Sequence, residues 1–174
     1  MPGVPRRVRF VTFRGGLSVG GASIPGMTAT PSAPARVSLI TLGVEDVARS
    51  TDFYLGLGWP LSPASVAGEV SFFRTSGGLL ALYAASALAA DTGLQQAPQG
   101  MFRGVTTAVN CDDEGQVDTT LEAAVAAGGT LVKPGQRADW GGYVGYFRDP
   151  DGHVWEVAWN PGWPIGEDGR PQLP

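Results

Sequence analysis

Apolar and polar residues follow two alternating patterns along most of the chain. The run VSLITLGV (37–44) is typical of a buried β-strand, and EDVARSTDFYLGLGW (45–59) carries apolar residues at helical spacing. Two further β-rich runs, EVSFFRT (69–75) and GLLALYA (78–84), are separated by a short glycine-containing turn, which predicts a hairpin. A strand, a helix and a hairpin therefore follow in order, with a short extra strand expected near Leu61 to Ala64.

The same order returns after an interlude of helix or loop around 86–102. The run GVTTAVNC (104–111) predicts a strand, DDEGQVDTTLEAAVAAGG (112–129) a helix that ends at two glycines, and TLVKPGQ (130–136) another strand. A hairpin, GGYVGYFRDPDGHVWEVAWNP (141–161), completes the second copy. The sequence is therefore an internal repeat.

This repeat predicts an α+β fold of two tandem βαβββ modules, over 35–100 and 101–160. Paired modules of this kind form a curved, partly open mixed sheet with the helices on its convex side. Its concave side is lined by alternate strand residues and is the natural place for a small ligand. We expect these cleft-facing positions to be Val70, Phe72, Leu79, Tyr83, Ala108, Asn110, Val144 and Tyr146.

The two ends of the chain differ from the modules. Residues 1–34 are rich in Gly, Pro, Ser and Thr, which predicts a disordered extension, and Met27 is an alternative start of translation. Residues 161–174 are too rich in Pro and Gly for a helix or an inner strand, so we expect an extended tail.

Composition and charge limit the kinds of molecule that the chain could bind. Beyond residue 33 the chain has 16 acidic and 8 basic residues, so it repels nucleic acid and favours neutral or cationic small molecules. No apolar run is long enough to span a bilayer. The single cysteine, Cys111, excludes an internal disulfide and favours a cytoplasmic location.

The segments ITLGVEDVARSTDFYLGLGW and GYFRDPDGHVWEVAWNP resemble the vicinal oxygen chelate superfamily, over roughly Val37 to Pro161. Its members include glyoxalases, ring-cleaving dioxygenases, fosfomycin-modifying enzymes and bleomycin-binding resistance proteins. The resemblance implies four metal-ligand positions, which fall in this sequence on Leu39, Ala81, Thr106 and Glu156. Only Glu156 offers a strong oxygen donor, so we expect no metal centre of the family type and no other cofactor.

The hairpin 141–161 holds the one histidine, His153, and Glu156. Alternation places these two on opposite faces of the strand, which favours a structural role for His153. A carboxylate among apolar neighbours needs a partner. Glu156 is either hydrogen-bonded to Thr106, Thr41 or a backbone amide, or a polar anchor for a ligand, or a general acid or base with a raised pKa.

These features favour a metal-free binding protein that sequesters a small hydrophobic or cationic molecule in the cleft of a homodimer. We expect the ligand to contact Phe72, Tyr83, Thr106, Asn110, Trp140, Tyr146 and Glu156. Trp140 either closes over the mouth of the cleft, packs on the surface or makes a dimer contact. The alternative is an enzyme of the glyoxalase, lyase or dioxygenase type, metal-dependent or using Glu156 as catalytic acid or base.

Overall fold

A computed structural model describes residues 33–98 and 100–174 of the chain. Residues 36–174 form one compact unit. The expected extension over 1–34, apart from its last two residues, and the alternative start at Met27 lie outside the described residues.

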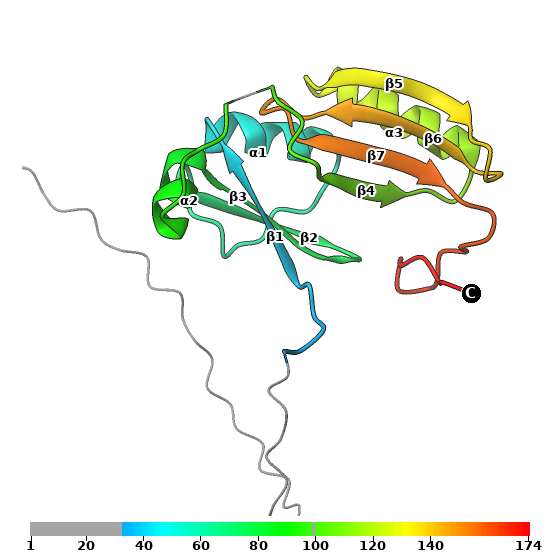
Figure 1. The fold of residues 1–174 in the computed structure, drawn as a ribbon, viewed down its shortest axis with the longest axis horizontal. Coiled ribbons are helices and arrows are strands. Elements are labelled where there is room, and N and C mark those ends of the chain that lie inside the picture. The colour runs from blue at the N-terminus through cyan, green and yellow to red at the C-terminus, as the bar shows by residue number, and fades with distance from the viewer. Residues whose placement is uncertain (1–32, 99) are drawn as a thin grey trace, which may run out of the picture. The chain divides into compact units, whose positions relative to one another are not determined.

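The first module has a three-stranded sheet, one helix between its strands and a second helix after them (Figure 1). Its elements are β1 (Leu39–Val44), α1 (Val47–Gly56), β2 (Val70–Thr75) and β3 (Gly78–Ala84). The strand order is β1-β3-β2, with β1 parallel and β2 antiparallel to β3. The extra strand expected near Leu61 is reduced to a single bridge between Leu61 and Phe73.

The second module is the fuller copy of the repeat. The interlude forms α2 (Ala85–Thr92), and then come β4 (Thr106–Asn110), α3 (Glu114–Ala126), β5 (Thr130–Arg137), β6 (Tyr143–Arg148) and β7 (Val154–Trp159). The strand order is β4-β7-β6-β5, with β4 parallel to β7 and the remaining pairs antiparallel. The α+β class and the repeat are confirmed, and the strands divide between two separate sheets.

One hydrophobic core serves both modules. Phe53 of α1, Leu121 of α3 and Trp155 of β7 belong to the same buried cluster. The ring of Phe53 lies 6.2 Å from that of Phe147, so the helix of the first module packs on the sheet of the second. In Figure 1, α3 covers one face of the four-stranded sheet and leaves the other face open.

Aspartate side chains start both main helices. The Asp46 carboxylate accepts hydrogen bonds from the backbone N–H of Ala48 and of Arg49 at the start of α1, and Asp113 accepts one from Gln116 at the start of α3. These bonds satisfy amides that the first helical turn leaves unpaired. They also fix where each helix leaves the strand before it.

The final residues, 161–174, were expected to be extended. Instead they turn back on themselves through a bridge between Ile165 and Pro171. The Arg170 side chain then joins this tail to the first module, because its Nε donates a hydrogen bond of 2.7 Å to the Ser76 carbonyl. Among the helices of the described residues, none has both the length and the hydropathy to cross a membrane.

Candidate functional site

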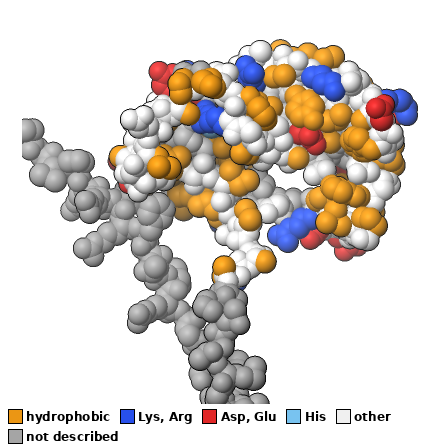
Figure 2. Space-filling model, viewed as in Figure 1, with side chains coloured by type: hydrophobic (Ala, Val, Ile, Leu, Met, Phe, Trp, Pro, Cys, Tyr) orange, Lys and Arg blue, Asp and Glu red, His pale blue; other side chains and the backbone are white. Residues whose placement is uncertain are grey.

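The β6–β7 hairpin presents opposite faces to the core and to the outside. Trp155 and Val157 point to the helices and are almost fully buried. Glu156 lies between them on the open face, directly opposite Tyr146 of β6. Figure 2 shows hydrophobic side chains gathered over this sheet with an acidic side chain among them.

Glu156 is held by a tyrosine. The Tyr146 hydroxyl donates a hydrogen bond of 2.7 Å to Oε2 of Glu156, in a partly buried setting. The partner is therefore neither Thr106 nor Thr41 nor a backbone amide, as the first of the three interpretations required. The other oxygen, Oε1, accepts no hydrogen bond from a described residue, so the carboxylate keeps one acceptor for an external group.

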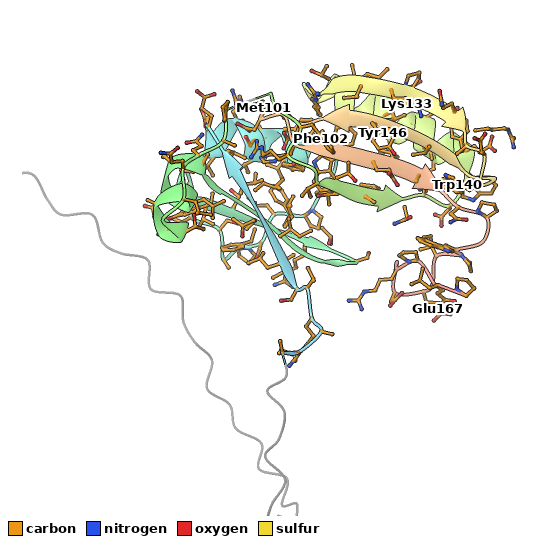
Figure 3. The ribbon with its side chains drawn as sticks, in the orientation of Figure 1. Met101, Phe102, Lys133, Trp140, Tyr146 and Glu167 are labelled. Carbon is orange, nitrogen blue, oxygen red and sulfur yellow. The ribbon has the colours of Figure 1, made fainter. Side chains whose placement is uncertain are left out.

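A row of side chains crosses the open face through this pair. Lys133 of β5 pairs with Tyr146, and Ala108 of β4 pairs with Glu156 on the other side. Nζ of Lys133 lies 5.9 Å from the centre of the Tyr146 ring, a cation–π contact. In the view of Figure 3, Tyr146 lies between Phe102 and Trp140 along the hairpin.

The pair fixes where the proton resides. The hydrogen bond to Glu156 raises the pKa of Tyr146 to about 12, with smaller contributions from burial and from the charge of the carboxylate. At neutral pH the phenol therefore keeps its proton and points it at Glu156. The pair presents a carboxylate oxygen and a phenol oxygen to anything that lies on this face.

The residues at the four positions implied for metal ligands do not suit a metal ion. Leu39 pairs with Leu79 and Ala81 with Thr41, so the first module contributes no charged or nitrogen donor. Thr106 pairs with Val154, two residue pairs away from Glu156. Across residues 33–98 and 100–174, no three His, Cys, Asp or Glu side chains gather as a metal site. A divalent cation needs several such ligands, and here one carboxylate stands alone.

The structure brings only some of the predicted ligand contacts together. Tyr146 and Glu156 are hydrogen-bonded on the open face of the four-stranded sheet. Phe72 and Tyr83 lie on the three-stranded sheet instead, where they pair with Ala81 and Val70. These two groups share no sheet, so the predicted lining comes from two surfaces.

The remaining predicted contacts lie at the edges. Thr106 is exposed on β4, and Asn110 of the same strand lines a cavity toward β1. Trp140 is 55% exposed, and a Cβ on Gly142 would clash with its ring, so the indole lies flat on the backbone of the hairpin. Of the three roles considered for Trp140, surface packing agrees with this position.

His153 has structural partners. Its ring Nε2 lies 2.9 Å from the carbonyl oxygen of Gly43 in β1. Its backbone N–H donates to Asp149 at 2.8 Å. His153 thus joins the turn of the second module to a strand of the first, on the side away from Glu156, as the alternation indicated.

Two buried aspartates are the polar residues that sequence reasoning missed. Asp149 accepts hydrogen bonds from the Tyr54 hydroxyl at 2.8 Å and from the N–H groups of Asp151 and His153. Burial raises the pKa of Asp149, and the charge of His153 and the hydrogen bonds from Tyr54 and His153 act in the opposite direction. The motif DPDG predicted a tight turn, but two acids before an apolar strand also signalled inward-facing carboxylates.

Asp151 ties the turn to α1. It forms an ion pair of 2.8 Å with Arg49 and accepts hydrogen bonds from the Ser50 hydroxyl and the Glu45 N–H. Every donor comes from the first module. The turn of the second module therefore anchors the start of the helix of the first.

Two cavities lie near the junction of the modules. One, of about 570 Å³, separates the outer edges of β1 and β4. The other, of about 400 Å³, lies between β1 and the segment around Met101 to Arg103. Neither is lined by Tyr146 or Glu156. Glu156 therefore lies outside both of these cavities.

Comparisons with known proteins agree with this architecture. A family model described as the Glyoxalase/Bleomycin resistance protein/Dioxygenase superfamily matches residues 36–157. A glyoxalase-related enzyme from Fulvimarina pelagi is 38% identical, with a TM-score of 0.72, over 80% of this chain and 99% of that one. A glyoxalase/bleomycin resistance protein/dioxygenase from Nocardioides is 29% identical, with a TM-score of 0.63, over 80% of this chain and 92% of that one.

A third structure supports the fold alone. The lactoylglutathione lyase from Agrobacterium tumefaciens is 21% identical, with a TM-score of 0.56, over 74% of this chain and 96% of that one. A comparison with curated proteins gives no match.

Proposed function

The chain belongs to the Glyoxalase/Bleomycin resistance protein/Dioxygenase superfamily. We propose that it binds a small hydrophobic or cationic molecule at Glu156, without a metal. One observation carries the proposal: Glu156 holds Tyr146 with one oxygen and keeps the other unpaired among the described residues. A ligand N–H or O–H group would complete this carboxylate. Sequestration of the ligand, as in bleomycin-binding proteins, is the function that this arrangement supports best.

The chemistry of the ligand follows from the neighbours of Glu156. Val154 and Ala158 flank it on β7, and Val144 lies opposite Ala158 on β6, so the carboxylate sits in an apolar surface. An amine attached to an apolar body would pair its charge with Glu156 and cover Val154, whereas Ala158 and Val144 are already buried within the chain. A charge-assisted hydrogen bond of this kind is stronger than one between neutral groups.

We further propose that a second copy of the chain covers this face and completes the cleft. Large apolar side chains remain exposed near it: Met101, Phe102 and Trp140 are 55–61% exposed. An apolar surface of this kind marks an interaction site. Pairing of two copies would enclose Glu156 and remove the ligand from water, which an open sheet cannot do.

The experiment is a calorimetric titration with phenethylamine and with its neutral analogue phenethyl alcohol. The wild type should bind the amine, and Glu156→Gln should raise the Kd for the amine about tenfold while changing that for the alcohol little. Glu122→Gln on the exposed side of α3 is the matched control and should behave as the wild type. Equal amine affinity in Glu156→Gln and the wild type would contradict the proposal.

Two further measurements bear on the same proposal. Sedimentation of the wild type should show a dimer, and Phe102→Asp should give a monomer that binds the amine weakly. Elemental analysis of protein purified without chelator should show no stoichiometric divalent metal. A tightly held metal that is lost in Glu156→Ala would overturn metal-free binding.

An enzyme that uses Glu156 as acid or base is the second candidate. The 2.7 Å hydrogen bond favours it, because a proton donor and a proton acceptor lie side by side on the open face. Such an enzyme would exchange the C–H protons beside a carbonyl group with solvent. Deuterium incorporation into hydroxyacetone that is lost in Glu156→Gln would support this candidate over simple binding.

A further inference from the structure

We propose that the cavity of about 570 Å³ between β1 and β4 is a second binding site, which takes a small amphipathic anion such as an aryl carboxylate. Glu156 does not line this site, although its cross-strand neighbour Ala108 does, and the site prefers the opposite charge. It does not depend on the function proposed above.

The cavity exists because two sheet edges are left unpaired. Within the described residues, β1 pairs only with β3 and β4 pairs only with β7. The outer edges of β1 and β4 line the space between them. Its volume lies in the range of about 300–1,000 Å³ that is usual for small-molecule sites.

The floor of the cavity is apolar and aromatic. Trp59, Leu80 and Trp155 line it, and the two indole rings pack edge to face with their centres 5.3 Å apart. Trp155 is buried and donates its Nε1–H to Tyr54. Trp59 is only half buried, and its Nε1–H has no acceptor among the described residues. This floor suits a flat apolar group with an acceptor near its edge.

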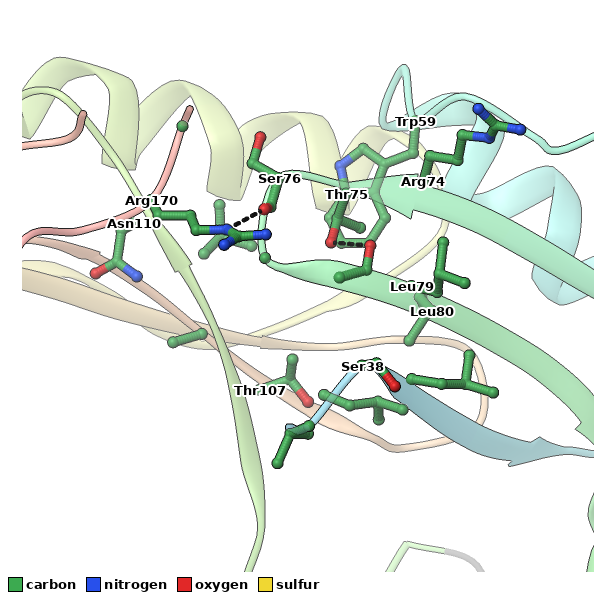
Figure 4. A pocket seen from close by; sticks show the side chains of 18 of the residues that line it. Ser38, Trp59, Arg74, Thr75, Ser76, Leu79, Leu80, Thr107, Asn110 and Arg170 are labelled. Atoms are coloured by element: carbon green, nitrogen blue, oxygen red, sulfur yellow. Dashed lines mark hydrogen bonds between the residues drawn. The ribbon is translucent and has the colours of Figure 1, made fainter. Parts of the chain in front are cut away.

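The rim of the cavity is positively charged. Arg170, from the tail, reaches toward the turn between β2 and β3 (Figure 4). Its Nε donates to the Ser76 carbonyl and lies 3.9 Å from Asp168, which holds the side chain in place. Neither terminal nitrogen of Arg170 donates a hydrogen bond to a described residue, and the side chain lines the cavity. Arg74 also lines the cavity, and Figure 4 shows its guanidinium turned away from it.

No carboxylate opposes this cation inside the cavity. None of the described lining residues is Asp or Glu, although acids outnumber bases in the chain. Apart from Arg74 and Arg170, the polar lining is neutral and includes Ser38, Thr107 and Asn110, whose side chains make no hydrogen bond with a described residue. A carboxylate at Arg170 with an apolar body against Trp59 and Leu80 would satisfy all of these features.

The test compares 4-phenylbutyrate with the neutral 4-phenylbutanamide on the full chain. The wild type should bind the acid more tightly than the amide. Arg170→Gln should raise the Kd for the acid about fivefold and leave the amide unchanged, since a largely exposed ion pair contributes about 1 kcal/mol. Arg137→Gln, which removes another exposed arginine paired with an acid, Glu114, is the matched control and should change neither.

NMR of the tryptophan indoles locates the site. Binding of 4-phenylbutyrate should shift the Nε1–H signal of Trp59 and leave that of Trp140 unchanged. Equal affinity for acid and amide, equal effects of Arg170→Gln and Arg137→Gln, or a shift centred on Trp140 would each overturn the proposal. Loss of acid binding at high protein concentration would show that a second copy fills the cavity, and would overturn it as well.

Binding at this cavity and binding at the open face can be tested independently. Glu156→Gln should leave binding of 4-phenylbutyrate unchanged, and Arg170→Gln should leave binding of phenethylamine unchanged. The two sites are therefore tested by separate variants and separate probes.

Discussion

The β6–β7 hairpin holds carboxylates on both of its faces, and the two faces treat them differently. Asp149 and Asp151, at the turn, are 3% and 4% exposed, and each accepts hydrogen bonds from three donors. Glu156, on the open face, has one donor and one oxygen left over. Acids whose bonds are all supplied by the chain stabilise the fold, whereas an acid left half satisfied has an acceptor for a ligand.

Position in the repeat explains the difference. In the first module the turn that corresponds to DPDG is TSGG, without an acid. The position of Glu156 corresponds to Ala81, which is buried and apolar. Both kinds of carboxylate were therefore added or kept in one copy only, on one hairpin.

The largest expected effect is on the core side. Asp149→Ala should lower the free energy of unfolding by about 3 kcal/mol, because it leaves the Tyr54 hydroxyl and two backbone N–H groups without acceptors. Denaturant unfolding measures this loss. The comparison is Glu156→Ala on the same hairpin, which should cost less than about 1 kcal/mol. Equal losses would show that the open-face carboxylate also stabilises the fold.

The pH dependence of stability should come next in size. Burial, followed by the charge of Asp149, raises the pKa of Tyr54 well above 10.0. The stability contributed by the protonated phenol is thus fully present below pH 10.0 and is lost as the pH rises toward the folded-state pKa. The loss is about 1.4 kcal/mol per pH unit.

Tyr54→Phe should remove this part of the alkaline slope. Unfolding free energies of the two proteins should be measured between neutral pH and alkaline pH and subtracted, because other tyrosines also titrate there. The variant is less stable at neutral pH, since Trp155 loses its acceptor. Parallel profiles for the two proteins would contradict the assignment.

The smallest effect belongs to the open face. Glu156→Gln should lower the pKa of Tyr146 from about 12 toward 10.0, because the hydrogen bond to a carboxylate is the main cause of the shift. NMR of the tyrosine rings, assigned with Tyr146→Phe, measures it. Tyr143, which is bonded to Asp118 on the other face, should not change. An unchanged Tyr146 would mean that the pair does not form in solution.

The sequence predicted what depends on local pattern. The order of strands and helices, and the placement of Tyr146 and Glu156 on one face, follow from periods of two and of 3.6 residues. The hydrogen bond between them could also have been predicted from the sequence, since the turn between two antiparallel strands sets which residues face each other. Thr106 and Thr41, the side chains expected as partners, lie on β4 and β1 outside this hairpin.

Features that join distant parts of the chain were not predictable in this way. Tyr54 and Asp149 are 95 residues apart, and their contact depends on how the two modules pack. The cavity between β1 and β4 likewise depends on edges that do not meet, and on a tail that doubles back to bring Arg170 to its rim. Periodicity assigns a residue to a face of its own strand and gives no information on the neighbouring module.

The bonds between Asp151 and the start of α1 bear on whether either copy of the repeat can fold without the other. Each copy lacks something that the other supplies: the first needs the carboxylates of the turn, and the second needs the aromatic rings of α1 to fill its core. Cleavage between α2 and β4 should therefore leave two fragments that remain bound to each other and that refold only when mixed. In that case neither copy of the repeat would be a folding unit by itself, and each would act as the complement of the other.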